Sequence, residues 1–292
     1  AGLWVRCVSK GGTALELNWL QSIALGLISG AADIFPVSAQ AHRLLLLKFF
    51  GVNQLSNLQA LLLHLSVAAA LYLSSQGQFV RMNRARALAR IPKKKRKRPL
   101  DTRSMMDWSL IKTMLVPTVI GLLLNSRVRT WSLSMFLIAG MLFVNGLILY
   151  IPQFLPTSNR DSRTLTRLEG ALMGLGAGFS VLPGISTVGV MTSIASVCGI
   201  ERLYGLNMTF IVKMFFLIGL MVYDVLAIIA GDLSGLTLML LIQYIFTAVM
   251  SFAAAMFGIR MLRKLAPEHG FHTFGVYCWG LALFAFILNL VV

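Results

Sequence analysis

Apolar residues run almost without interruption through long stretches of the chain. The stretches Leu58–Leu73 and Met208–Ile229 are typical of this pattern. Runs of about 18 residues or more are long enough to cross a bilayer core of about 30 Å as helices. A transmembrane barrel would alternate apolar and polar positions instead. The pattern therefore predicts an all-α polytopic membrane protein.

Composition excludes a soluble domain. The 292 residues are 57% hydrophobic and only 12% charged, whereas soluble domains carry about 25% charged residues. The net charge of +16 is unevenly distributed, because 11 of the 26 Lys and Arg residues fall between Arg81 and Arg103. No aromatic residue is interleaved there to stack on bases, so we interpret the run as a cytoplasmic loop that attracts anionic lipid, with no nucleic-acid partner.

The basic clusters indicate which ends of the spans face the cytoplasm. With a basic loop at 77–106 inside, spans at 54–75, 107–124 and 131–150 lead to a second basic loop near Arg160. Spans at 203–230, 236–259 and 271–292 follow, and both termini lie outside. Segment 167–201 then begins and ends on the cytoplasmic side, which predicts a re-entrant hairpin. By the same reasoning, segment 19–51 is a hairpin that enters from outside.

Each predicted hairpin breaks at a proline followed by small residues. Pro36 precedes Val37-Ser38-Ala39-Gln40, and Pro183 precedes Gly184-Ile185-Ser186-Thr187. The prolines lie half a chain apart, and each hairpin is followed by three spans. This order predicts two inverted repeats in one membrane domain, with the hairpin tips meeting near the midplane. The first repeat covers 19–151 and the second 152–292, after an N-terminal segment at 1–18.

Ionisable residues inside a membrane are costly and point to function. Asp33 precedes Pro36 by three residues, and His42 follows it by six, with Ser38 and Gln40 between. We expect Asp33 and His42 to face one enclosed polar cavity. Two alternatives are that Asp33 caps backbone amides and that His42 is structural beside an interfacial Arg43.

Lys213 lies inside an apolar stretch and needs an anionic partner unless it snorkels to the interface. Asp224 is 11 residues further on, which is about 16 Å along a helix, so the two cannot pair directly. His64, a single histidine in an apolar span, is interpreted as satisfied locally.

The two tips resemble the signatures of a known family. Gly30-Ala-Ala-Asp33-Ile-Phe-Pro36-Val-Ser38-Ala-Gln-Ala-His42 resembles the first signature of the undecaprenyl-diphosphate phosphatase family of bacterial bacitracin-resistance proteins. Leu182-Pro183-Gly184-Ile185-Ser186-Thr187-Val188-Gly189 resembles the second. The resemblance covers most of the chain from about Asn18 and implies two interlocked inverted repeats.

The resemblance also implies chemistry: removal of the terminal phosphate of undecaprenyl diphosphate with a divalent metal, Mg²⁺ or Ca²⁺. It assigns His42 as general acid/base or nucleophile, and Asp33 as metal ligand or as the group that orients His42. Ser38 completes the expected catalytic set. The expected substrate-binding residues are Gln40, Gly184, Ser186, Thr187 and Lys213.

The sequence departs from the family pattern at several positions. Ser29 stands where the family has a carboxylate or an amide. Ala39 and Val188 each stand where the family has a serine. Thr187 stands where the family has an arginine that clamps diphosphate. We expect Lys213 to supply the missing positive charge, with Asp33 or a bound phosphate as its anion.

Two functions follow from these observations, and no nucleotide-hydrolysis or zinc signature competes with them. The first is a polyprenyl-diphosphate phosphatase that recycles the lipid carrier of cell-wall synthesis in the bacterial cytoplasmic membrane. The alternative is a non-catalytic descendant that binds or transports a polyprenyl phosphate, and a scaffold role is a third interpretation. The sequence leaves a homodimer open.

Overall fold

The computed structural model describes residues 17–52, 54–96, 99–128, 134–156, 159–231, 236–267 and 270–291. These residues form helices and no β-strand, which confirms the all-α prediction, and nearly all of segment 1–18 lies outside them. The helices are α1 (Trp19–Ile34), α2 (Ala39–Phe49), α3 (Asn57–Ala89), η1 (Lys93–Lys95), α4 (Thr102–Leu123), α5 (Asn125–Val128), α6 (Met135–Tyr150), η2 (Ile151–Phe154), α7 (Arg167–Phe179), α8 (Thr187–Val197), α9 (Arg202–Ala230), α10 (Leu238–Leu265) and α11 (His272–Val291).

Six helices in the described ranges are long and apolar enough to cross a membrane, namely α3, α4, α6, α9, α10 and α11. They correspond to the six predicted spans. The protein is therefore a multi-pass membrane protein. Each of the two shorter helix pairs, α1–α2 and α7–α8, is followed by three of these long helices. This order agrees with the predicted repeats, whose inverted relation stays a prediction.

The basic connection between α3 and α4 is shorter than the predicted loop at 77–106. Helix α3 continues to Ala89, and α4 begins at Thr102 with Asp101 as its N-cap. The stretch from Arg81 to Ala89 is rich in arginine and alanine, which are strong helix formers. The helix therefore continues past its apolar part.

A helical hairpin is present at each predicted place, and local chemistry explains the two breaks, while re-entry into the membrane stays a prediction. Helix α1 ends before Pro36, which has no N–H to continue the helix. Helix α2 then begins with Ser38 as N-cap, and Ser186 caps α8 in the same way. Between α7 and α8 the chain turns at Gly184, whose φ of +103° strongly favours glycine.

Arg160 joins the two legs of the second hairpin at their base. Its guanidinium donates to Glu169 Oε1 in α7 at 2.7 Å and to the carbonyl of Cys198, just after α8, also at 2.7 Å. A charged bidentate donor of this kind fixes geometry strongly. The basic residue that marks the second predicted loop is therefore also a structural clamp.

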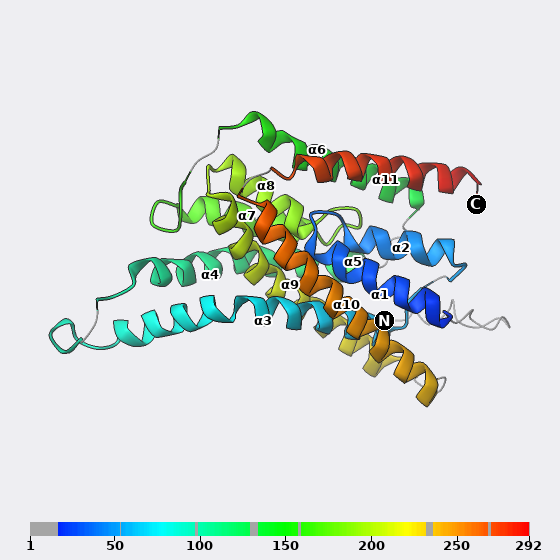
Figure 1. The fold of residues 1–292 in the computed structure, drawn as a ribbon, viewed down its shortest axis with the longest axis horizontal. Coiled ribbons are helices and arrows are strands. Elements are labelled where there is room, and N and C mark those ends of the chain that lie inside the picture. The colour runs from blue at the N-terminus through cyan, green and yellow to red at the C-terminus, as the bar shows by residue number, and fades with distance from the viewer. Residues whose placement is uncertain are drawn as a thin grey trace.

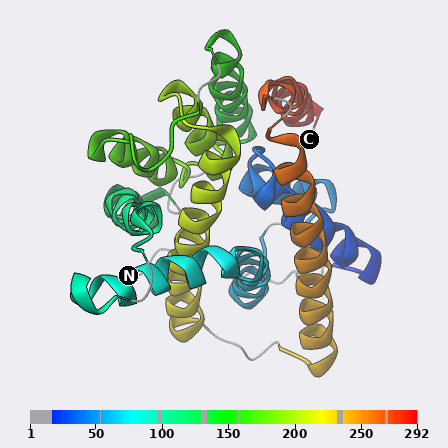
Figure 2. The same ribbon diagram turned by 60° about the vertical axis from the view of Figure 1, so that its left-hand side comes forward.

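The long helices surround the hairpins. Figure 1 shows α6 and α11 packed side by side along the upper edge of the molecule. Helices α3 and α4 extend together toward its left-hand end. The start of α1 and the end of α11 lie at the same end of the molecule, away from the α3–α4 connection. In Figure 2, α9 and α10 run along the height of the molecule, and the first hairpin lies beside α10.

Candidate functional site

The two hairpin tips are tied together by hydrogen bonds, as predicted. The amide of Gly184 donates to Ser38 Oγ at 3.1 Å. Asn145, which is fully buried in α6, bridges both tips: its Nδ2 donates to the Pro36 carbonyl at 3.2 Å, and its Oδ1 accepts from the Ser186 amide at 2.9 Å. One amide side chain therefore satisfies backbone groups freed at both breaks.

A small cavity of about 40 Å³ lies where the tips meet. The starts of α2 and α8 both border it, so two helix N-termini with their positive dipole ends face the same space. Its polar lining residues are Asp33, Ser38, Gln40, Arg43, Asn125, Ser180, Ser186, Thr187 and Lys213. Of the predicted site residues, all line this cavity except His42 and Gly184. The Gly184 amide is directed to Ser38 instead.

Lys213 reaches the position that the sequence analysis assigned to it. Its Nζ lies 3.0 Å from Asp33 Oδ1 and donates to Thr187 Oγ1 at 3.3 Å. Both charged side chains are less than a tenth exposed, so the alternative in which Lys213 snorkels to the interface is wrong. The charge missing at Thr187 is present beside that residue, on a lysine from α9.

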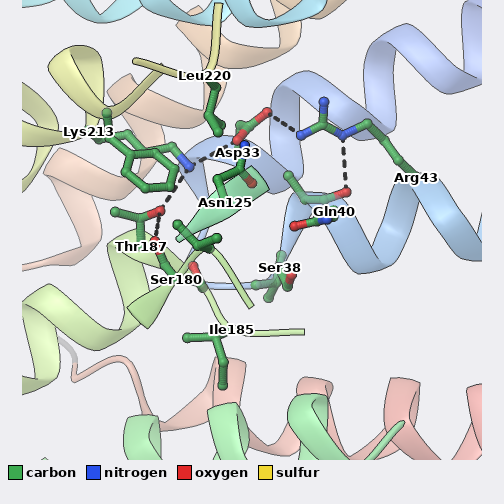
Figure 3. Close-up of a pocket in the computed structure, with 15 residues that line it drawn as sticks. Asp33, Ser38, Gln40, Arg43, Asn125, Ser180, Ile185, Thr187, Lys213 and Leu220 are labelled. Atoms are coloured by element: carbon green, nitrogen blue, oxygen red, sulfur yellow. Dashed lines mark hydrogen bonds and ion pairs between the residues drawn. The ribbon is translucent and has the colours of Figure 1, made fainter. Parts of the chain in front are cut away.

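Arg43 is not interfacial, which corrects the sequence analysis. Its side chain is 11% exposed, and its Nη2 lies 3.5 Å from Asp33 Oδ2. Figure 3 shows Lys213 and Arg43 approaching Asp33 from opposite sides. The helix start at Ser38 places Arg43 one turn beyond the cap, on the face of α2 that points into the bundle.

His64 and Asp224 extend this network, and the interpretation of His64 as locally satisfied is wrong. His64 Nδ1 lies 2.7 Å from Asp224 Oδ2 on α9, and its Nε2 lies 3.1 Å from Arg43 Nη1 on α2. The prediction that Asp224 does not pair with Lys213 agrees with this arrangement. Lys213, Asp33, Arg43, His64 and Asp224 form a continuous buried series in which each contacts the next.

His42 lies outside the cavity, so the prediction that it shares one cavity with Asp33 is wrong. Its Nδ1 bonds to the Ser38 carbonyl at 2.7 Å, and its Nε2 bonds to Tyr277 Oη at 2.8 Å. The His42 and Tyr277 rings are also stacked. Asp33 therefore does not orient His42. A carbonyl only accepts, so Nδ1 carries the proton that bonds to Ser38.

The side chains around Asp33 do not fit the predicted Mg²⁺ or Ca²⁺ site. Such ions take six or more oxygen ligands, chiefly from carboxylates, carbonyls and water. Across the described ranges, no group of three His, Cys, Asp or Glu residues is placed to hold a metal ion. The Asp33 carboxylate lies between two cations instead. A metal requirement stays a prediction.

Sequence reasoning missed four residues of the site: Arg43, Asn125, Asn145 and Tyr277. Asn125 and Asn145 are polar residues in or beside apolar spans. Placing a polar side chain in the membrane is energetically costly, and this alone is a signal of function. Tyr277 carries no such signal, because tyrosines are common in membrane helices.

The fold and the site define a multi-pass helical membrane protein with a buried polar site between two helical hairpins. The model of the bacitracin resistance protein BacA family matches residues 22–284, so the chain belongs to this family.

Curated relatives match along nearly the whole chain. An undecaprenyl-diphosphatase of Carboxydothermus hydrogenoformans is 28% identical over 276 residues, which is 94% of this chain and 98% of the relative. Undecaprenyl-diphosphatase 1 of Shouchella clausii is 26% identical over 280 residues, covering 94% and 97%. An undecaprenyl-diphosphatase of Methanobrevibacter smithii is 24% identical over 276 residues, covering 93% and 98%.

Proposed function

We propose that the protein is an integral membrane phosphatase that hydrolyses undecaprenyl diphosphate to undecaprenyl monophosphate and phosphate. Family membership and the names of relatives that match end to end support this function. In this role the protein recycles the lipid carrier of cell-wall synthesis in the bacterial cytoplasmic membrane. Basic loops on the cytoplasmic side, external termini, anionic lipid at the α3–α4 connection and a homodimer remain proposals.

One observation carries the proposal: two helix N-termini and a buried lysine meet at one cavity. Free N–H groups at helix starts bind phosphate in many proteins. Here the starts of α2 and α8 come from different halves of the chain and converge beside Lys213. Ser186, Thr187 and Gln40 add polar groups to the same lining. This combination suits a tetrahedral anion better than any uncharged ligand.

The reaction can be written with the groups present. A water oxygen bonds to the terminal phosphorus, and the bond from that phosphorus to the bridging oxygen breaks. The bridging oxygen leaves with its electron pair on the monophosphate, and the water loses a proton. Asp33 Oδ2 makes no hydrogen bond among the described residues, so we assign it as the proton acceptor. Lys213 stabilises charge on the phosphoryl group.

Ser38 connects the cavity to His42. Its Oγ accepts from the amides of Gly184 and Ala41, which leaves its O–H to donate to a phosphate oxygen. Its carbonyl accepts the bond from His42 Nδ1. We therefore assign His42 as a positioning residue that acts through Ser38, with Tyr277 holding the other side of the ring.

Phosphate release from undecaprenyl diphosphate by purified full-length protein in detergent tests the proposal, with added Mg²⁺ and with EDTA in parallel. We expect release by the wild type and roughly a 100-fold lower kcat in His42→Ala, because a small displacement of Ser38 from the phosphate can cost that much. His42→Asn keeps a donor and should recover much of that activity if His42 positions Ser38, whereas a general base would show no recovery. Lipid binding without any phosphate release would favour the alternative of a binding or transport protein.

A further inference from the structure

Arg43 is a second buried cation at the cavity, and its contacts are long for a charged donor. Nη2 lies 3.5 Å from Asp33 Oδ2, Nε lies 3.4 Å from the Ala39 carbonyl, and Nη1 lies 3.1 Å from His64 Nε2. Hydrogen bonds between a guanidinium and a carboxylate or phosphate usually measure about 2.7–2.9 Å. The guanidinium has five donors, so much of its capacity is unused.

His64 holds Arg43 through a neutral nitrogen. An arginine N–H can only donate, so Nε2 of His64 accepts. Its Nδ1 then carries the proton and donates to Asp224 Oδ2 at 2.7 Å. A neutral imidazole nitrogen binds a guanidinium less strongly than an anionic oxygen does. Arg43 is thus positioned near the cavity but can exchange this partner for a phosphate.

Asn125 supplies an independent sign of a ligand. It begins α5, lines the cavity and is only 4% exposed. Its Nδ2 has no hydrogen-bond partner among the described residues. An unpaired buried donor is destabilising, so native proteins seldom leave one without a reason. Figure 3 places Asn125 beside Asp33, within the group of side chains that line the cavity.

We propose that Arg43 and Asn125 bind the lipid-linked phosphate of a prenyl diphosphate, while Lys213 and the starts of α2 and α8 bind the terminal phosphate. This inference rests on the proposed function and extends it to substrate selection. Asp33 offsets one of the two cations, whereas a diphosphate carries at least two negative charges. Both cations are therefore needed, and the arginine fork matches two phosphate oxygens at once.

The size of the cavity agrees with a movement of Arg43. On this measure a cavity needs roughly 10–15 Å³ to hold one water molecule, so about 40 Å³ corresponds to a few waters, which is less than a diphosphate needs. Side chains must move when the lipid binds. Arg43 has a long flexible side chain and weak contacts, so moving it requires little free energy.

Equilibrium binding tests this assignment with two probes: a methylene-bridged prenyl diphosphate, which cannot be cleaved at the bridge, and inorganic phosphate, which corresponds to the terminal phosphate alone. We expect Asn125→Ala and Arg43→Gln to weaken diphosphate binding on the order of 10- to 100-fold. Binding of inorganic phosphate beside Lys213 should change by less than about threefold, since neither residue contacts it. Lys213→Met should weaken both. Asn57→Ala and Arg90→Gln, at exposed positions, are matched controls.

The variants separate the two levels of the proposal. Equal losses for both probes, or no loss for either, would overturn the assignment. Arg43→Gln also removes a partner of Asp33 and can misfold, in which case Asn125→Ala decides alone. A wild type that hydrolyses the diphosphate while Asn125→Ala keeps full selectivity rejects this inference only. A wild type that binds neither probe rejects the proposed function as well.

Discussion

Lys213 and Asp33 form an ion pair between an α9 side chain and the first hairpin, 180 residues apart in sequence. Each charge alone would be costly in a membrane, and their contact lowers that cost for both. Arg43 stands on the other side of Asp33 at a longer distance. The carboxylate therefore holds two cations at the edge of the cavity, where a phosphate can compete for them.

We predict that Lys213→Met destabilises the protein by about 3 kcal/mol, at the low end for breaking a buried pair because Arg43 stays beside Asp33. Thermal unfolding in one detergent measures this change. The double variant Asp33→Asn, Lys213→Met removes both charges of the pair but leaves Arg43 without its carboxylate partner, so it should recover little of the loss. Lys112→Met removes an exposed lysine from another long helix and should have little effect. Similar losses in the Lys112 and Lys213 variants would contradict the pairing argument.

At the scale of elements, the two helical hairpins place helix starts inside the molecule, which continuous helices cannot do. A break inside the membrane frees backbone amides, and a second break beside it supplies their partners. Ser38 at the first break accepts from Gly184 at the second, and Asn145 of α6 joins both. The tips are therefore rigid, and they aim two helix starts at one cavity.

Gly184→Ala should disrupt this junction. The residue has a φ of +103°, and an added Cβ would lie 2.5 Å from Met141 Cβ. We expect a loss of roughly 1–3 kcal/mol in stability and a fall in turnover, because the Gly184 amide would leave Ser38. Gly140→Ala is the matched control. Gly140 lies in α6 next to Met141, the residue that an added Cβ at position 184 would meet, but nothing lies within 4 Å of its own added Cβ. There the change should be neutral or slightly stabilising.

Thermal unfolding and phosphate release, measured on both glycine variants, check these expectations. Wild-type turnover in Gly184→Ala would mean that the tip tolerates a different backbone and that the Ser38 contact is not needed.

At the scale of the whole molecule, the α3–α4 connection lies at one end, and the start of α1 and the end of α11 lie at the other. Basic loops usually stay in the cytoplasm, which would place the start of α1 and the end of α11 outside. The large apolar side chains exposed along the long helices, such as Val116, Ile229 and Leu283, then face lipid. A polyprenyl tail can lie against the same surface while its phosphates enter the site.

Labelling of single cysteines with a membrane-impermeant thiol reagent tests this orientation in intact cells. In a background without native cysteines, Gln54→Cys should react and Lys95→Cys should react only after the membrane is permeabilised, since both positions are exposed at opposite ends of α3. The reverse pattern would invert the topology and place the basic connection outside.

Much of the fold could be predicted because it depends on local properties of the chain. Hydropathy located the six long helices, and Pro36 and Pro183 located the breaks, since a proline cannot donate within a helix. The α3–α4 connection is shorter than predicted, because alanine and arginine continue helix α3 through the first part of the basic run.

The partners of the site residues were decided only by the tertiary structure. Sequence indicated that Asp33, His42 and Lys213 carry unusual polarity, but the rotation of each helix about its axis decides which face meets which neighbour. That rotation turned His42 toward Tyr277 and Arg43 toward Asp33 and His64. It also brought Asn125 to the cavity from a different part of the chain. A polar residue in an apolar stretch is recognisable from the sequence alone, whereas its partner depends on how all the helices pack together.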